Sequence, residues 1–228
     1  MRIWDIHPGY LARQQLLGEH RELHGLFNII DQGKKGYARH PETLRWVGCK
    51  QALVKRHKLL VCEMRLRGYN HHSPLIEGDE IDVLWPESYI DAPARQFELL
   101  AGKYAADQRS GRIPLPLNTQ QLWAQYKYSV MAIAPQLYRE IGPEVAHGRF
   151  RDDMGRLSLL LVETLRGRPQ SGRIFNALQH MWGYVNADAG EMPADPSQLL
   201  QEIQQRSLSQ QQQYLLHSTA LCDLASWV

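Results

Sequence analysis

The chain has 228 residues, 43% of them hydrophobic, and a formal net charge of +2 at pH 7. This length is enough for one large domain or two small ones with a buried core. No stretch approaches the 18 apolar residues of a membrane span, and the N-terminus lacks an apolar signal core. We therefore expect a cytoplasmic protein that works at the nucleoid and has no membrane partner.

The cysteines are few and widely spaced, at Cys49, Cys62 and Cys222. Their spacing contains no paired metal-ligand motif. The pattern is typical of buried thiols in a reducing compartment and predicts neither a disulfide framework nor a zinc site.

Charge is distributed unevenly along the chain. Residues 1–70 carry 13 Lys and Arg against 6 Asp and Glu, whereas residues 71–228 carry 13 against 18. A basic segment suits the neutralisation of nucleic-acid phosphates, although such a cluster is also common on an ordinary solvated surface.

The first predicted helix covers residues 11–31 and follows a turn at His7-Pro8-Gly9. A stripe with helical spacing predicts its buried face, formed by Leu16, Leu23, Phe27 and Ile30.

Two glycines flank Glu22 within this helix, at Gly18 and Gly25. Each costs about 1 kcal/mol relative to alanine, so a packing reason is expected. Either the glycines form a slot in which the N-terminal strand crosses close to Glu22, or another helix packs over them.

The segment from Leu11 to Leu23, counted back to Met1, resembles the phage endonuclease V family of pyrimidine-dimer DNA glycosylases without insertion or deletion. The similarity is strongest over residues 1–23 and extends to about residue 70. It implies an all-α unit that removes a damaged base from double-stranded DNA and then cleaves the strand as an AP lyase. It also implies that the chain's own α-amine is the nucleophile, that Glu22 works beside it, and that no cofactor is needed.

The nucleophile implied by this register is the α-amine of Met1. Arg2 is too large for the usual removal of the initiator methionine, so retention of Met1 is expected. An α-amine is a weaker base than a lysine side chain, so more of it is neutral near pH 7 and able to form a Schiff base. Because nearly every protein begins with methionine, only the matched spacing to Glu22 supports this role. The alternative for Glu22 is a surface ion pair with Arg21.

The resemblance also implies DNA contacts. Arg2, Gln14 and Arg21 match positions that contact DNA around the lesion in the family. A family arginine is replaced by Gly25 and a family histidine by Gln15. These two differences leave the substrate specificity open, so the lesion is either a pyrimidine dimer or another damaged base.

A basic, glycine-rich turn follows the first helix and contains Lys34 and Lys35. It is either a DNA contact or a solvated loop.

Residues 41–67 are predicted to be helical with a break near Gly48 and a cap at Gly68. In this region we expect one apolar face, Leu53, Leu60 and Met64, and one basic outward face, Lys55, Arg56, Lys58, Arg65 and Arg67. We assign no metal-ligand role to His71 and His72, because the nearby acidic residues of the 77–82 stretch are unspecific.

A further helix is predicted over residues 92–109, followed by a proline-rich link at 113–117. An aromatic cluster then begins, formed by Trp123, Tyr126, Lys127 and Tyr128. These side chains either stack on a distorted base step or form an aromatic core.

Residues 122–185 resemble an uncharacterised bacterial helical domain that is sometimes attached to thiouracil desulfurase-like proteins. One helical face there is polar, and with Arg139 it forms a candidate site for an anion or a nucleobase: Asn176, Gln179, His180 and Tyr184. The alternatives are a hydrogen-bonded core histidine and helix–helix packing.

The predicted fold is all-α, with an endonuclease V-like helical domain at residues 1–115 and a second helical domain of unknown function at 116–228. The boundary falls within residues 110–122. The glutamine-rich stretch at 201–213 is expected to be an exposed helix or a connector, and the apolar end at 214–228 to dock on the body or on a partner. Two alternatives to a bifunctional glycosylase remain: a non-catalytic nucleic-acid-binding protein, and a nucleobase- or RNA-modifying enzyme centred on the C-terminal domain. The sequence does not fix the oligomeric state.

Overall fold

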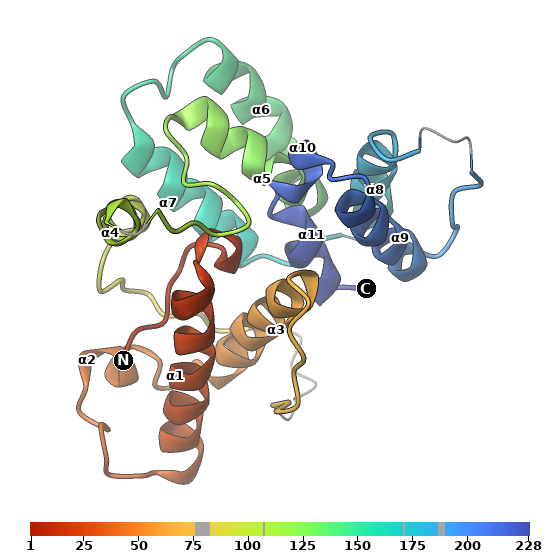
Figure 1. Cartoon of the computed structure of the whole chain (residues 1–228). Helices are drawn as coiled ribbons and strands as arrows, with labels where there is room; N and C mark the ends of the chain where they lie inside the picture. Colours follow the sequence, from red (N-terminus) through yellow and green to blue (C-terminus); the bar gives the residue numbers. More distant parts are fainter. Residues whose placement is uncertain (76–82, 107, 171, 187–189) are drawn as a thin grey trace.

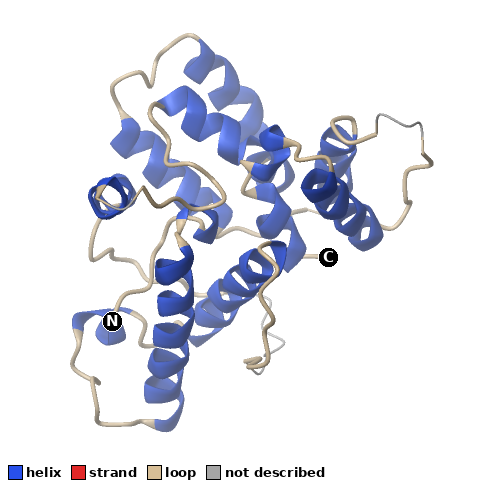
Figure 2. Ribbon diagram, in the orientation of Figure 1, coloured by secondary structure: helices blue, strands red, loops and turns tan. Residues whose placement is uncertain are grey.

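The computed structural model describes the chain except residues 76–82, 107, 171 and 187–189. The described part contains helices and loops but no strand, which confirms the all-α prediction (Figures 1 and 2). The helices in chain order are α1 Arg13–Gln32, α2 Pro41–Arg45, α3 Lys50–Leu66, α4 Pro93–Ala105, α5 Thr119–Ile133, α6 Pro135–Ala146, α7 Met154–Leu165, α8 Arg173–Trp182, α9 Pro196–Ser209, α10 Gln213–Leu216 and α11 Ala220–Asp223, with short 3-10 helices at Pro8–Tyr10 and Leu224–Ser226.

Helix α1 is the longest element and carries the N-terminal site described below. Its predicted stripe is largely confirmed: Leu16, Leu23 and Phe27 are buried, and Ile30 is half-buried. The helix ends at Gly33, whose positive φ of 60° gives the left-handed C-terminal cap that favours glycine.

The expected interruption between the next two helices is present at Gly48, where φ is 82°. Helix α3 is followed by Gly68, also in the left-handed region. The predicted apolar face of α3 is buried. The prediction that Arg56 and Arg67 point outward is wrong, because Arg56 is only 3% exposed and both guanidinium groups bind carboxylates and backbone carbonyls.

Two hydrophobic cores lie along the molecule, and α5 contributes to both. The first core runs from Ile3 through α1 and α3 to Val162 in α7. The second runs from Tyr128 through α8 and α9 to Leu224. Because α5 packs on both sides, the two sequence regions fold against each other, and the boundary near residue 115 stays a prediction.

A buried carboxylate ties α3 to the segments that follow it. The Glu63 side chain is fully buried and accepts hydrogen bonds from Arg67 at 2.7 Å and from Arg112 at 2.7 Å. Arg112 also donates to the backbone carbonyls of Leu216 and Ser218. The link after α4 is therefore fixed to α3 and to the C-terminal segment at one point.

The C-terminal segment docks on the body as expected, since Leu221, Cys222 and Leu224 are buried. The glutamine-rich stretch lies mostly in α9, which has an apolar face and is therefore neither fully exposed nor a connector. All three cysteines are free thiols. None of the helices in the described ranges is long and apolar enough to cross a membrane.

Candidate active site

The extended segment at the start of the chain crosses α1 and is held there by two glutamates one turn apart. The backbone N–H of Trp4 donates to Glu19 Oε1 at 3.2 Å, and the backbone N–H of Arg2 donates to Glu22 Oε2 at 2.5 Å. These two bonds fix the direction of the segment and therefore the position of Met1.

The first of these glutamates, Glu19, is part of a buried ion pair. Arg56 donates from Nε to Oε1 at 2.7 Å and from Nη2 to Oε2 at 2.9 Å, and it also binds the carbonyl of Ile6 at 2.8 Å. Burial raises the pKa of Glu19, and the guanidinium of Arg56 opposes this effect. Arg56 thus connects α3, α1 and the N-terminal segment.

The second glutamate, Glu22, lies next to the N-terminus. Its Oε1 is 3.9 Å from the Met1 amine, and its side chain is 41% exposed, whereas that of Met1 is 11% exposed. The carboxylate is therefore open to solvent on one side and faces the amine on the other. The structure brings together the two groups that the sequence paired.

The N-terminal segment crosses α1 beside Glu22, as expected, but the prediction that Gly18 and Gly25 make room for it is wrong. A methyl group added at Gly18 or Gly25 would meet no atom within 4 Å apart from the helix's own backbone, so neither glycine is needed for the crossing of the N-terminal segment. The same result excludes close helix packing over them. Gly25 is exposed, which leaves the surface one turn after Glu22 open.

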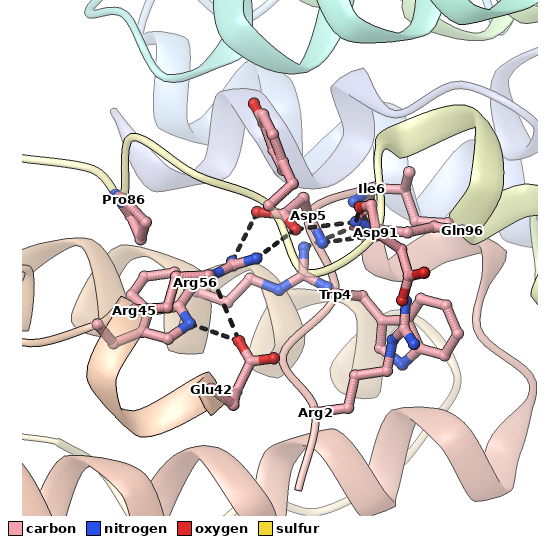
Figure 3. A network of polar contacts seen from close by, with 12 residues as sticks. Arg2, Trp4, Asp5, Ile6, Glu42, Arg45, Arg56, Pro86, Asp91 and Gln96 are labelled. Carbon is pink, nitrogen blue, oxygen red and sulfur yellow. Dashed lines mark hydrogen bonds and ion pairs between the residues drawn. The ribbon is translucent and has the colours of Figure 1, made fainter. Parts of the chain in front are cut away.

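Arg2 is held by protein groups in this structure. Its guanidinium binds Asp91 at 2.9 Å and stacks on the Trp4 ring, with its Cζ 4.0 Å from the centroid (Figure 3). A phosphate would have to compete with Asp91 for it. Arg21, in contrast, is exposed and makes no hydrogen bond or ion pair with any residue that the structure describes.

Beside the N-terminal segment lies a charged network centred on Asp5 (Figure 3). Arg45 binds both carboxylate oxygens at 2.8 and 2.9 Å, and Gln96 donates to the same carboxylate at 2.8 Å. Arg166 lies 3.5 Å from Asp5 Oδ1. This network joins α2, α4 and the residue that follows α7 to the start of the chain, and the sequence did not indicate it.

The other predicted DNA contacts lie near the start of α1 and beyond its end. Gln14 is exposed and accepts a hydrogen bond from Arg109. Lys34 and Lys35 are exposed beyond the end of α1. Gln32, the last residue of α1, is ten helical steps after Glu22, which at 1.5 Å of rise per residue is about 15 Å along the helix.

The aromatic cluster of α5 belongs to the core and not to a base-binding surface. Trp123, Tyr126 and Tyr128 are 9%, 1% and 4% exposed. The Tyr126 hydroxyl accepts a hydrogen bond from the backbone N–H of His7 at 3.4 Å. The base-stacking interpretation is therefore wrong, because these rings have no free face to offer.

The polar residues proposed for the second domain lie on the surface. Asn176, Gln179 and His180 are exposed on α8, so the expectation of a core histidine is wrong. Tyr184 is also exposed and contacts the ring of Tyr214, with centroids 4.8 Å apart. Arg139 is exposed on α6 and forms no hydrogen bond or ion pair within the described part of the chain. The anion or nucleobase site formed by these residues stays a prediction.

Residues 1–77 match the pyrimidine dimer DNA glycosylase family. Residues 127–217 match the family described as protein of unknown function DUF1722. Both resemblances expected from the sequence are thereby confirmed. No curated protein and no solved structure gives a match.

The glycosylase match covers both residues of the Met1–Glu22 pair and the glutamate–arginine pair at Glu19 and Arg56. Over residues 1–77 the chain is thus similar to a family described as pyrimidine dimer DNA glycosylase. The acidic stretch at 77–82 lies outside the described residues.

Proposed function

We propose that the protein is a bifunctional DNA glycosylase and AP lyase that uses the Met1 α-amine as its nucleophile on damaged double-stranded DNA. The observation that carries this proposal is the 3.9 Å separation between the Met1 nitrogen and Glu22 Oε1 within the family-matched region. An amine held beside a half-exposed carboxylate is the arrangement that Schiff-base chemistry at a sugar carbon requires.

In the first stage, the neutral amine attacks C1′ of the damaged nucleoside. The N–C1′ bond forms, the glycosidic bond breaks, and the base leaves with its electron pair and takes up a proton. The attached nitrogen then gives up a proton to Glu22, the C1′–O4′ bond opens, and O4′ takes up this proton, so that the positive charge remains on the iminium that joins Met1 to C1′. Glu22 thus passes the proton to the opening ring and stabilises the charge.

In the second stage, a base removes a proton from C2′. The electron pair forms a double bond between C2′ and C3′, and the 3′ phosphate leaves with the electrons of the C3′–O bond. Glu22 is the base at this stage, because it is the carboxylate next to the amine that holds the sugar. Hydrolysis of the imine then frees Met1.

The choice of lesion depends on the residues around the Met1–Glu22 pair. Arg21 is the exposed cation next to Glu22 in sequence and is our candidate for a phosphate contact. The open surface at Gly25 leaves room for DNA where the family carries a larger side chain. The substrate class is therefore a pyrimidine dimer or another damaged base whose distortion lowers the cost of exposing C1′.

The test is borohydride trapping of the full chain on ultraviolet-irradiated duplex DNA, followed by mass analysis of the adduct. We expect a covalent adduct on the peptide that begins with Met1, and no adduct after selective acetylation of the α-amine. Intact mass analysis of the unreacted protein checks that Met1 is present and unblocked.

Three results would contradict the proposal. An adduct on a lysine would move the nucleophile, and trapping on abasic DNA but not on any damaged-base duplex would leave only lyase chemistry. Binding to damaged DNA without any adduct would favour the non-catalytic nucleic-acid-binding alternative.

A further inference from the structure

Four histidines from three segments meet on the side of α1 that faces α3. His20 and His24 lie one turn apart on α1, His57 comes from α3, and His71 follows the end of α3. Their ring centroids are separated by 4.7 Å for the closest pair and 5.2 Å for His20 and His57. One ring nitrogen from each residue lies within 4.8 Å of all the others.

These rings share an unusual property. The Nε2 atoms of His20, His24, His57 and His71 are all buried and have no hydrogen-bond partner among the described residues. Buried polar atoms are normally satisfied, and leaving one unsatisfied is costly. Four such histidines, each with a ring nitrogen within 4.8 Å of the others, therefore indicate a ligand that accepts lone pairs from the rings.

The electrostatic environment favours the form of histidine that binds a cation. Burial, together with the charges of the neighbouring histidines, lowers the pKa of His20 to about 4 and that of His57 to about 3. Burial also lowers the pKa of His24 and His71. Burial thus disfavours the charged form of all four rings, and metal binding requires a neutral imidazole.

We propose that His20, His24, His57 and His71 bind one divalent transition-metal ion of the zinc class through their ring nitrogens. Imidazole suits zinc, copper, iron and nickel, and four protein ligands in a tetrahedron are typical of a structural site. Zn–N bonds of about 2.0–2.1 Å place neighbouring nitrogens about 3.3 Å apart, so binding draws the widest pair together through small side-chain rotations.

The cluster is also open to solvent on one side. An open groove of about 670 Å³, lined in part by His57, His71 and Gln204, connects the cluster to solvent and gives the ion an entry path.

The ion has a structural function in this proposal. Successive helical residues are about 100° apart, so Glu22 lies roughly opposite His20 and His24 on α1. The cation therefore does not meet the Met1–Glu22 pair. It fastens the helix that carries Glu22 to α3 and to the segment around His71, and it would do so whether or not the proposed glycosylase chemistry is correct.

Titration with Co²⁺ is the first experiment, made on the full chain without a histidine tag after dialysis against a chelator. We expect one ion per chain with the intense visible absorption of tetrahedral cobalt, and displacement by one equivalent of Zn²⁺. The weak absorption of six-coordinate cobalt, or binding below one ion per chain, would overturn the proposal. Because this measurement uses the unaltered chain, it decides the question even where a histidine variant fails to fold.

Variants then assign the ligands. His24→Ala and His57→Ala should each weaken Zn²⁺ binding by more than the 10–100-fold that loss of an outer-shell partner typically costs, roughly 100-fold or greater. His72→Ala is the matched control, because His72 is exposed, adjacent to His71 and outside the cluster. We expect Zn²⁺ to raise the Tm of the wild type and of His72→Ala, but not that of His24→Ala.

Equal affinity in wild type and His24→Ala would overturn the assignment, as would an equal loss in His72→Ala. Protein acetylated at Met1 should still bind Zn²⁺ while losing the trapped adduct. The metal site and the proposed nucleophile can therefore fail independently.

Discussion

Glu19 and Glu22 lie one turn apart on α1 but have opposite surroundings. The side chain of Glu19 is fully buried, and both of its oxygens bind Arg56. Glu22 is 41% exposed, and its oxygens meet only the backbone N–H of Arg2 and the amine of Met1 among the described residues. One carboxylate therefore holds the N-terminal segment in place, while the other remains available at the end of that segment.

The largest effect expected from this comparison is on activity, in Glu22→Gln. The amide keeps an acceptor for the Arg2 N–H but can neither donate a proton as an acid nor accept one as a base. We expect single-turnover release of the damaged base and strand cleavage to fall by about 10²–10⁴-fold, with the Tm nearly unchanged.

Single-turnover incision of a defined lesion duplex, with a parallel thermal melt, measures both quantities. The matched control is Glu98→Gln, since Glu98 is exposed and paired with Arg95 on the surface. Unchanged incision in Glu22→Gln would remove this carboxylate from the chemistry.

Glu19→Gln should produce the opposite result, with its main effect on stability. Removal of one partner leaves Arg56 buried without its counter-charge, and breaking such a pair typically costs about 3–5 kcal/mol. Urea unfolding monitored by circular dichroism measures this loss. For comparison, Glu202→Gln breaks a partly exposed pair with Arg206 and should cost less than about 1 kcal/mol. Equal costs in the two variants would show that the Glu19 pair does not anchor the segment.

The closeness of Met1 to Glu22 was predictable from the resemblance of residues 1–23 to the dimer glycosylases, because that register pairs the α-amine with a glutamate on the first helix. The burial of Arg56 was not, because a basic residue on a helix usually points to solvent, and its partners, Glu19 and the Ile6 carbonyl, lie far away in sequence. Periodicity also could not separate an aromatic core from a base-stacking surface at Trp123 and Tyr126.

The histidine cluster could not be predicted from the sequence for a related reason. His20 and His24 have the spacing of one helical turn, which was the single local signal. His57 and His71 reach them only after α3 has packed against α1 and the chain has turned at Gly68. A ligand set drawn from three segments has no fixed spacing that a motif search would find.

Glu63 is a second buried carboxylate, like Glu19. Burial alone would raise its pKa, but Arg112 and Arg67 outweigh this effect and hold it at about 2, below the reference of 4.5. The lowered folded-state pKa means that Glu63 stabilises the protein above about pH 4.5 and that this contribution is lost as the pH falls from 4.5 towards 2. At 1.36 kcal/mol per pH unit, the contribution is about 3 kcal/mol.

Unfolding free energies measured across this acid range should therefore fall less steeply in Glu63→Gln than in the wild type. Glu22→Gln, whose carboxylate is half-exposed, serves as the matched comparison. Parallel pH profiles in Glu63→Gln and the wild type would contradict the assigned ion pair.

The smallest expected effect is on DNA binding, and it follows from a comparison of two arginines, Arg21 on α1 and Arg56 on α3. Arg56 is fully committed to protein groups, whereas Arg21 is exposed and has no partner in the described part of the chain. If Arg21 contacts one DNA phosphate, Arg21→Ala should weaken binding to damaged and undamaged duplexes to a similar extent and lower the slope of log K against log salt by about 1. Arg95→Ala is the matched control, because Arg95 is exposed but paired with Glu98. Anisotropy titrations at several salt concentrations separate the two variants, and an unchanged slope in Arg21→Ala would mean that DNA approaches Glu22 from another side.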